Sequence, residues 1–266
     1  MTIQISLAGK SALVTGGGAG IGRAVAVGLA QAGANVAVTD IVATAAQETC
    51  ELVRAEGREA IALIGDMTDP DQVDQLVEEA AQRLGGVHIG VNNVGMLGKH
   101  TAAPFLDWTA QAMSDVVTGN LLATMYSCQA EATAMIGRGI NGVIVNVTSG
   151  ETTRPAVRLA PYGAAKAAIN HLTQTLAVEL APHRIRVNAV APGTTLTQDV
   201  AARLGAEYRQ ALKASIPLGG ELSDPRDLAD LVLFLASDLA AHTTGQFLLS
   251  DNGAFLSRSR PGLTAD

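Results

Sequence analysis

The most constraining feature of the sequence is a regular alternation of two hydrophobic patterns along the chain. Seven runs of strand length are rich in apolar and β-branched residues, at 11–15, 35–39, 60–64, 88–91, 143–148, 186–190 and 246–249. Between them, Ala, Leu and Val recur with helical spacing, as at 69–84, 108–136, 162–181 and 224–236. Runs such as VIVNV are almost wholly apolar, which is typical of strands covered by helices on both faces. The alternation predicts an α/β fold with a doubly wound, seven-stranded parallel sheet flanked by helices.

The sequence contains no boundary that would divide this pattern into two domains. A length of 266 residues with 48% hydrophobic residues is enough for one large core, and no Pro/Ser-rich linker or internal repeat interrupts it. We therefore expect one domain over residues 1–266. In such folds the sites lie beyond the carboxyl ends of the strands.

Composition and charge exclude several kinds of partner. The net charge of -7 leaves no basic stripe for phosphates, so we expect no nucleic acid. The longest uncharged run, 24–39, is too short and too polar for a membrane span. Cys50 and Cys128 lie far apart, no Cys/His cluster has metal-ligand spacing, and the N-terminus lacks a signal-peptide pattern. These features predict a cytoplasmic protein without a bound metal.

A glycine-rich turn follows the first predicted strand. Residues 15–22 read TGGGAGIG and open a predicted helix. Glycines permit a tight turn and let backbone N–H groups and the helix N-terminus approach a pyrophosphate. The alternative is a plain strand-to-helix connection. Asp40 ends the second predicted strand, where a carboxylate would meet the ribose hydroxyls of an adenosine.

A second constellation consists of Ser149 and the segment YGAAK at 162–166. On a helix, Tyr162 and Lys166 share a face because they are four residues apart. A phenol with a pKa of about 10 is a poor base at neutral pH, and a neighbouring ammonium would lower that pKa. The alternative is a surface Tyr and a solvated Lys stacked on one turn.

Taken together, these motifs resemble the short-chain dehydrogenase/reductase (SDR) family. The likeness covers roughly residues 7–255 and rests on TGGGAGIG, Asp66-Met67, NNVG at 92–95, Asn120, Ser149, YGAAK, NAVAPG at 188–193 and TGQ at 244–246. It implies a Rossmann-type sheet that binds NAD or NADP and supports hydride transfer between nicotinamide and a secondary alcohol or ketone.

The resemblance also implies roles for individual residues. Tyr162 would be the general base in alcohol oxidation and the acid in ketone reduction, Ser149 would bind the substrate oxygen, and Lys166 would hold the nicotinamide ribose. Asn120 would hold a water that links Lys166 to solvent, or would be a buried Asn satisfied by backbone groups. The cofactor-binding residues would be Gly16, Gly20, Ile21, Gly22, Asp40, Asp66, Met67, Asn92, Val94, Gly95, Tyr162, Lys166, Pro192, Gly193, Thr195 and Thr197.

Cofactor choice depends on charge near the adenosine ribose. Asp40 would place a carboxylate where the 2′-phosphate of NADP must sit. Unit like charges ~4 Å apart repel by about 4 kcal/mol at an effective dielectric near 20, before screening. Arg23 is the nearest cation, and its place in the predicted helix indicates a solvated residue. The sequence therefore predicts NAD in preference to NADP.

Substrate contacts in the family come from three loops, here about 94–104, 150–161 and a lid at 194–217, with a tail at 256–266 beyond them. Glu151 and Arg154 are the charged candidates for substrate recognition. The alternative is a salt bridge between them, away from substrate.

Two further expectations concern assembly and rival activities. The Ala-rich, weakly charged helices at 108–136 and 162–181 predict a homotetramer, since relatives pair through these helices. A 3-oxoacyl-[acyl-carrier-protein] reductase using NADPH would share the motifs, and so would a non-catalytic nucleotide-binding member. The latter would be free to lose Ser149, Tyr162 or Lys166, and all three are present.

Overall fold

The computed structural model describes residues 5–257, and within them it contains one sheet of seven parallel strands. The sheet order is β3-β2-β1-β4-β5-β6-β7. The strands are β1 (Ser11–Thr15), β2 (Asn35–Asp40), β3 (Ala60–Ile64), β4 (Ile89–Asn92), β5 (Val143–Val147), β6 (Arg186–Pro192) and β7 (Phe247–Ser250). The predicted α/β fold with its seven-stranded parallel sheet is confirmed.

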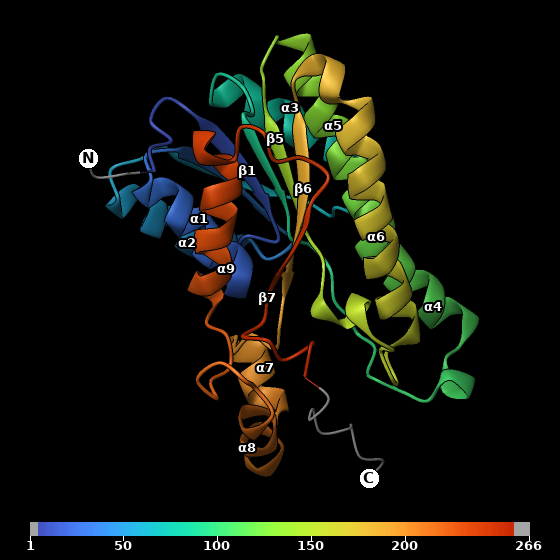
Figure 1. Cartoon of the computed structure of the whole chain (residues 1–266). Helices are drawn as coiled ribbons and strands as arrows, with labels where there is room; N and C mark the ends of the chain where they lie inside the picture. Colours follow the sequence, from blue (N-terminus) through green and yellow to red (C-terminus); the bar gives the residue numbers. More distant parts are fainter. Residues whose placement is uncertain (1–4, 258–266) are drawn as a thin grey trace.

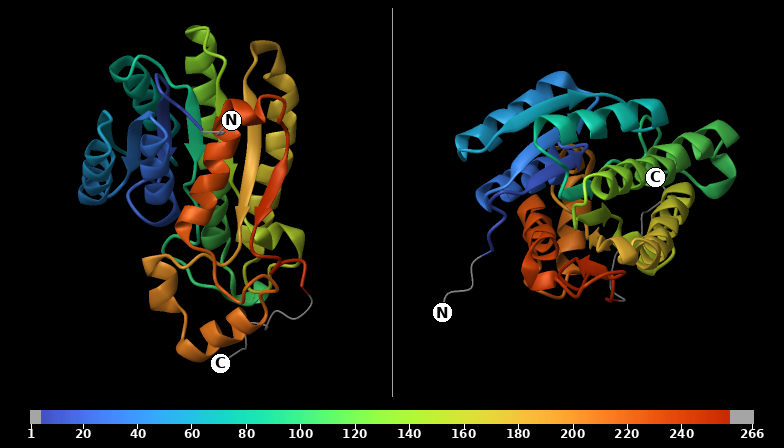
Figure 2. Two further views of the ribbon diagram at one scale, coloured as in Figure 1. Left: turned by 60° about the vertical axis from the view of Figure 1, so that its left-hand side comes forward. Right: turned by 90° about the horizontal axis from the view of Figure 1, so that it is seen from above.

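Helices cover both faces of the sheet (Figures 1 and 2). One layer contains α1 (Gly20–Gln31), α2 (Ala43–Ala55) and α9 (Pro225–Ala236). The other contains α3 (Pro70–Arg83), α5 (Ala123–Gly137) and α6 (Ala160–Glu179), and α5 and α6 run side by side in both figures. The prediction of a doubly wound arrangement is therefore also confirmed.

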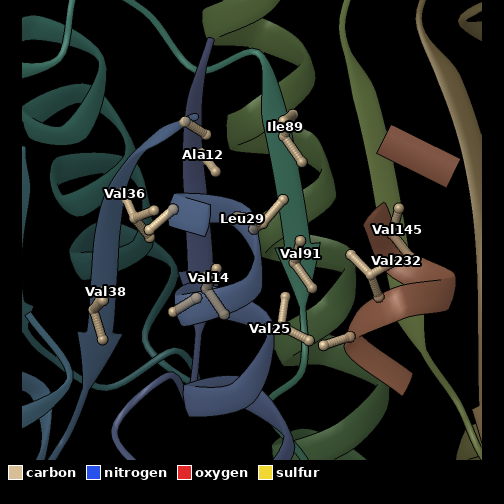
Figure 3. Close-up of a cluster of buried hydrophobic side chains, with 14 of the residues drawn as sticks. Ala12, Val14, Val25, Leu29, Val36, Val38, Ile89, Val91, Val145 and Val232 are labelled. Atoms are coloured by element: carbon tan, nitrogen blue, oxygen red, sulfur yellow. The ribbon is translucent and has the colours of Figure 1, made fainter. Parts of the chain in front are cut away.

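The core explains why the strand sequences are apolar on both sides. Alternate residues of a strand face opposite sides of the sheet. Val14 of β1 packs with Val25 of α1 and Val232 of α9 (Figure 3), whereas its neighbour Leu13 belongs to the core under α3, α5 and α6. Each fully buried aliphatic side chain of this kind contributes about 1.5–3 kcal/mol of transfer free energy. Because helices cover both faces of the sheet, a ligand site can form only at the ends of the strands.

The predicted helix at 108–136 is interrupted in the structure. It consists of α4 (Ala110–Val117), one π-helical turn (Thr118–Leu122) and α5. Isolated π turns are rare and occur frequently at functional sites. This one carries Asn120, whose side chain is fully buried.

The strand order reverses between β1 and β4, so their carboxyl ends form the crevice where ligands bind in open α/β sheets. Beyond this end of the sheet lie α7 (Gln198–Arg203) and α8 (Ala206–Ala214), at the bottom of Figure 1. They occupy the predicted lid at 194–217, and the lid role stays a prediction. Residues 258–266 of the predicted tail lie outside the described residues. Of the helices formed by residues 5–257, none has the length and apolar character needed to cross a bilayer.

Candidate active site

A cleft of about 440 Å³ opens at the carboxyl ends of the strands. Many of the residues that the sequence singled out line it: Gly16, Gly20, Ile21, Gly95, Ser149, Glu151, Tyr162, Lys166, Pro192, Gly193, Thr195 and Thr197. The other predicted site residues are not part of its lining: Gly22, Asp40, Asp66, Met67, Asn92, Val94, Asn120 and Arg154. The sequence analysis did not identify Asn93, Met96, Leu97, Gln198 or Phe255, which also line the cleft.

The glycine-rich turn has the form of an anion cradle. Gly16 and Gly20 have left-handed backbone angles, with φ of 59° and 53°. A Cβ at Gly22 would lie 2.2 Å from the Gly16 carbonyl oxygen, so α1 packs directly on the turn. Ala19 at the N-cap of α1 has no side-chain acceptor for the first N–H groups of the helix. These donors face the cleft and fit a pyrophosphate better than any neutral group.

Asp40 stands at the outer side of this turn. Its Oδ2 accepts a hydrogen bond from Gly18 N at 2.9 Å, and its Oδ1 accepts one from Val42 N at 2.9 Å. A Cβ at Gly18 would lie 2.6 Å from the carboxylate, so the turn and the carboxylate are in direct contact. The side chain is fixed at the tip of β2, beside the cradle.

The prediction that Arg23 is a solvated helix residue is wrong. Its Nε donates to Gly18 O at 2.9 Å and to Thr49 Oγ1 at 3.0 Å, and its Nη2 forms an ion pair with Glu48 at 2.9 Å. The guanidinium is thus held between the glycine turn and α2, because the first helical turn of α1 packs against that helix. Its charge is balanced by Glu48 rather than directed at the Asp40 carboxylate.

Thr15 and Asn93 join the two strands of the crevice. Thr15 Oγ1 accepts hydrogen bonds from Asn93 N at 3.0 Å and from Val94 N at 3.3 Å, and Asn93 Nδ2 donates to Gly16 O at 3.0 Å. Asn93 is the second Asn of NNVG, and that position was the available signal for its role. The first, Asn92, is buried at the end of β4 and does not line the cleft.

Asp66 and Met67 follow β3 at the far side of the sheet. Asp66 is exposed, and its Oδ1 accepts hydrogen bonds from Thr68 N at 2.9 Å and from Thr68 Oγ1 at 2.8 Å. Met67 is buried, and its Sδ accepts a hydrogen bond from Thr39 Oγ1 at 3.6 Å. The Asp66 carboxylate therefore remains accessible from solvent.

Ser149, Tyr162 and Lys166 meet at one wall of the cleft. Ser149 follows β5, its Oγ accepts a hydrogen bond from Glu151 N at 3.1 Å, and it lies close enough to Tyr162 to lower the pKa of the Tyr162 hydroxyl. Lys166 lies one helical turn after Tyr162, and its Nζ is 5.9 Å from the centre of the phenol ring. Lys166 Nζ also donates to Val147 O at 2.9 Å. The shared helix face predicted for Tyr162 and Lys166 is present.

Burial dominates the protonation of these groups. Burial raises the pKa of Tyr162, the nearby Ser149 side chain lowers that pKa, and the charge of Glu151 raises it further. Burial also lowers the pKa of Lys166 to about 8. The pKa of Tyr162 is raised overall because burial outweighs the lowering effects, and Lys166 directs its ammonium at the Val147 carbonyl; that Lys166 lowers the pKa of Tyr162 stays a prediction.

Asn120 and Lys166 converge on Gly95. A Cβ at Gly95 would lie 2.5 Å from Asn120 Oδ1 and 2.7 Å from Lys166 Nζ, and the backbone φ of 154° there favours glycine. Asn120 Oδ1 accepts a hydrogen bond from Met96 N, and its Nδ2 donates to Met96 O at 2.7 Å and to Val116 O at 2.8 Å. The Asn120 side chain is thus satisfied by backbone groups, the alternative that the sequence left open.

The loop after β6 closes the cleft opposite the glycine turn. Thr197 caps α7, its Oγ1 accepting a hydrogen bond from Val200 N at 3.2 Å. A Cβ at Gly20 would lie 3.1 Å from Thr197 Cγ2. Thr195 is buried and donates to Gly193 O at 3.2 Å.

Phe255 forms a wall that the sequence did not reveal. Asp251 accepts hydrogen bonds from Gly253 N at 2.9 Å and from Phe255 N at 2.6 Å, which fixes the turn after β7. A Cβ at Gly150 would lie 2.6 Å from the Phe255 ring. The Arg154 guanidinium carbon lies over the same ring, 4.1 Å from its centre. Arg154 therefore supports this wall from outside, while Glu151 lines the cleft; the predicted ion pair between them stays a prediction.

Known proteins resemble this chain over nearly all of its length. A family model described as enoyl-(acyl carrier protein) reductase matches residues 16–254. The chain is 38% identical over 255 residues to L-rhamnose 1-dehydrogenase (NAD(P)(+)) of Sphingomonas sp. (strain SKA58), covering 94% of this chain and 98% of that relative. It is 32% identical over 253 residues to 5-keto-D-gluconate 5-reductase of Escherichia coli (strain K12), covering 95% and 98% respectively. The solved structure of 7α-hydroxysteroid dehydrogenase complexed with NADH and 7-oxo glycochenodeoxycholic acid has a TM-score of 0.89 at 33% identity, covering 95% and 98%.

Proposed function

The chain belongs to the short-chain dehydrogenase/reductase family, and from that premise we propose that it interconverts a secondary alcohol and its ketone with NAD. As a family member it is an NAD(P)-dependent oxidoreductase acting on CH–OH groups. The finer proposal is carried by one observation: Ser149, Tyr162 and Lys166 share a wall of the cleft at the topological switch point.

The residues of the cleft fit a dinucleotide cofactor. The α1 N-terminus and the glycine turn would hold its pyrophosphate, and Pro192, Gly193, Thr195 and Thr197 would enclose it from the other side. Lys166 has three N–H donors, of which Val147 O takes one, so others can bind the nicotinamide ribose. A bound nicotinamide supplies the hydride acceptor for oxidation or the hydride donor for reduction.

The charge distribution supports NAD in preference to NADP. Asp40 presents a carboxylate at the edge of the cradle, and the nearby Arg23 is paired with Glu48. A 2′-phosphate beside Asp40 would meet uncompensated negative charge. Asp66 would contact the adenine in either cofactor, so it does not contribute to the choice.

The proton step follows from the presence of the Ser149 and Tyr162 hydroxyls on one wall of the cleft. Both hydroxyls can bind the same substrate oxygen, Ser149 as the fixed partner and Tyr162 Oη as the atom that takes or gives the proton. In oxidation Tyr162 accepts the alcohol proton; in reduction it donates one to the developing alkoxide.

The raised pKa of Tyr162 gives the two directions opposite pH dependences. At neutral pH Tyr162 is a phenol, the form that reduction needs. Oxidation needs the phenolate, so its rate rises with pH toward the Tyr162 pKa. Reduction falls over the same range.

An acyl-carrier-protein substrate is the second candidate, because the matching family model carries that description. An acidic carrier protein would need free cations at the mouth of the cleft. Lys99 and His100 both pair with Asp115, at 3.4 Å and 2.9 Å, so neither of these two side chains is free for such a partner. A small alcohol or ketone is therefore favoured as the substrate.

The proposal extends to organisation and assembly. Exposed apolar side chains on α5 and α6, namely Met125, Ile136 and Val178, support a homotetramer formed through these helices. The chain would act as a single cytoplasmic domain, with 194–217 as its substrate lid.

A screen of secondary alcohols and ketones tests the proposed function. The nicotinamide absorbance change is followed with NAD(H) and NADP(H) in both directions. Turnover of a small alcohol with NAD supports the proposal, and turnover only of acyl-carrier-protein substrates with NADPH contradicts it.

A further inference from the structure

A carboxyl group lies in the core between the sheet and α5, outside the cleft. Glu131 is 0% exposed and points from α5 at β4. A Cβ at Gly90 of β4 would lie 2.3 Å from Glu131 Cδ. The carboxyl therefore fills the space that a side chain at strand position 90 would need, and the two residues form a matched pair.

Within the described part of the chain, the hydrogen bonds around Glu131 leave two buried acceptor atoms without a donor. Asn92 Nδ2 donates to Glu131 Oε2 at 3.1 Å and to Asn146 Oδ1 at 3.1 Å. Cys128 Sγ donates to Asn146 Oδ1 at 3.3 Å, and Asn146 Nδ2 donates to Thr173 Oγ1 at 3.0 Å. Within residues 5–257, Glu131 Oε1 and Asn92 Oδ1 are buried acceptors without a partner. A proton on Glu131 would add the donor that this cluster lacks, whereas a carboxylate would add a further unsatisfied charge.

No cation among the described residues compensates a charge on Glu131. Around it, β4 contributes Gly90 and Asn92, and β5 contributes Asn146. The α6 side of the cluster ends at Thr173, and the α3 residues of this core are apolar. The neighbouring titratable group is Cys128 of α5, whose own pKa is raised by burial and by Glu131. Burial accordingly raises the pKa of Glu131 to about 8.

The cluster lies directly below the active site. Asn92 and Asn146 are register partners of β4 and β5. The chain continues from Asn92 to Asn93, which bonds the glycine turn, and from β5 to Ser149. Thr173 belongs to α6, the helix that carries Tyr162 and Lys166. A change of charge at Glu131 thus acts on every element that holds a catalytic group.

We propose that Glu131 is a positioning residue that, as a neutral carboxylic acid, locks the carboxyl ends of β4 and β5 beneath the active site, and that its deprotonation loosens this lock. The effect on turnover rests on the proposed function; the effect on folding does not. The two effects are therefore measured separately.

Folding stability tests the protonation. A carboxyl whose folded pKa lies above its unfolded value stabilises most below the unfolded pKa, about 4.3, and loses that contribution as pH rises to about 8. Between pH ~5.5 and ~7.5 the unfolding constant of the wild type should rise about tenfold per pH unit relative to that of Glu131→Gln, since one proton is released on unfolding. Urea titrations measure this. Glu79→Gln, at an exposed glutamate of α3, is the matched control and should follow the wild type.

Parallel pH dependences in the wild type and Glu131→Gln would overturn the proposal. Should Glu131→Gln fail to fold, carbon-13 NMR of glutamate-labelled wild-type protein decides the matter at pH 7. A carboxyl resonance of a neutral acid supports the proposal, and its absence from the folded protein contradicts it.

Turnover tests the positioning. Glu131→Gln keeps the shape and the neutral charge, so kcat at pH 7 should stay within about twofold of the wild type, whereas Glu131→Ala should lose about tenfold or more. Above pH ~8 the kcat of the wild type should fall reversibly relative to the kcat of Glu131→Gln at the same pH, in either direction of the reaction, because both proteins share the pH dependence of Tyr162. If kcat falls equally in Glu131→Gln and Glu131→Ala, Glu131 contributes only to packing and the positioning proposal is wrong. The same conclusion follows if kcat of the wild type and of Glu131→Gln depends on alkaline pH in the same way. If no alcohol is turned over at all, the proposed function fails while the stability result still stands.

Discussion

Replacing Asp40 by Asn removes one negative charge from the edge of the cradle, together with one of the two hydrogen bonds that the carboxylate accepts from backbone N–H groups. An Asn side chain still offers one oxygen to Gly18 N, which bonds the carboxylate at 2.9 Å in the wild type. At an effective dielectric near 20, unit like charges ~4 Å apart repel by about 4 kcal/mol before screening. Asp40 is partly exposed, so solvent and salt reduce this to roughly 1.4 kcal/mol, equivalent to about tenfold in rate. Arg23 does not cancel this repulsion, because Glu48 neutralises it.

The assay compares kcat/KM for NAD and NADP with one alcohol. The wild type should prefer NAD by at least about tenfold, and Asp40→Asn should narrow that ratio mainly by improving NADP. Asp66→Asn is the matched control, since it removes the same charge at an exposed site on the adenine side and should leave the ratio unchanged. An unchanged ratio in Asp40→Asn would refute the placement of this carboxylate beside the ribose.

Three other predictions concern the buried Lys166, the Phe255 wall and the assembly. Burial lowers the pKa of Lys166 to about 8, below its unfolded value of ~10.4, so the free energy of unfolding should rise with pH between these two values. Lys166→Met should abolish that rise in urea titrations, and an unchanged pH slope in this variant would contradict burial of Lys166 as the cause. Phe255→Ala should lower the free energy of unfolding by about 3 kcal/mol and raise kcat/KM for bulky alcohols relative to small ones; unchanged selectivity would exclude Phe255 as a substrate wall. Light scattering at micromolar concentration should give the mass of a homotetramer and a smaller mass for Val178→Arg, whose position on α6 is 75% exposed; a monomeric wild type would refute the assembly.

The sequence predicted the features that depend on spacing along the chain. The order of strands and helices, the glycine turn and the pairing of Tyr162 with Lys166 all follow from local periodicity. Features that depend on distant partners were missed. Arg23 was misinterpreted because its partners Glu48 and Thr49 come from α2, and Phe255 was missed because the turn fixed by Asp251 is invisible in a hydrophobicity pattern.

Two further features show what a helical hydrophobicity pattern does not predict. The π turn at Thr118–Leu122 alters the helix locally without changing the apolar composition around it, so 108–136 read as one helix. Glu131 reads as a surface position, because charged residues are rarely buried without a partner. Its burial depends on Gly90 in a strand 41 residues earlier.

The central claim is that Tyr162 transfers the proton, and Tyr162→Phe tests it most directly. The substitution keeps the ring beside Lys166 and removes only the hydroxyl that is proposed to transfer the proton. Measured together, kcat should fall by about 10² or more while NADH binding, followed by fluorescence, stays nearly unchanged. Retention of most of the wild-type kcat in Tyr162→Phe would contradict the account.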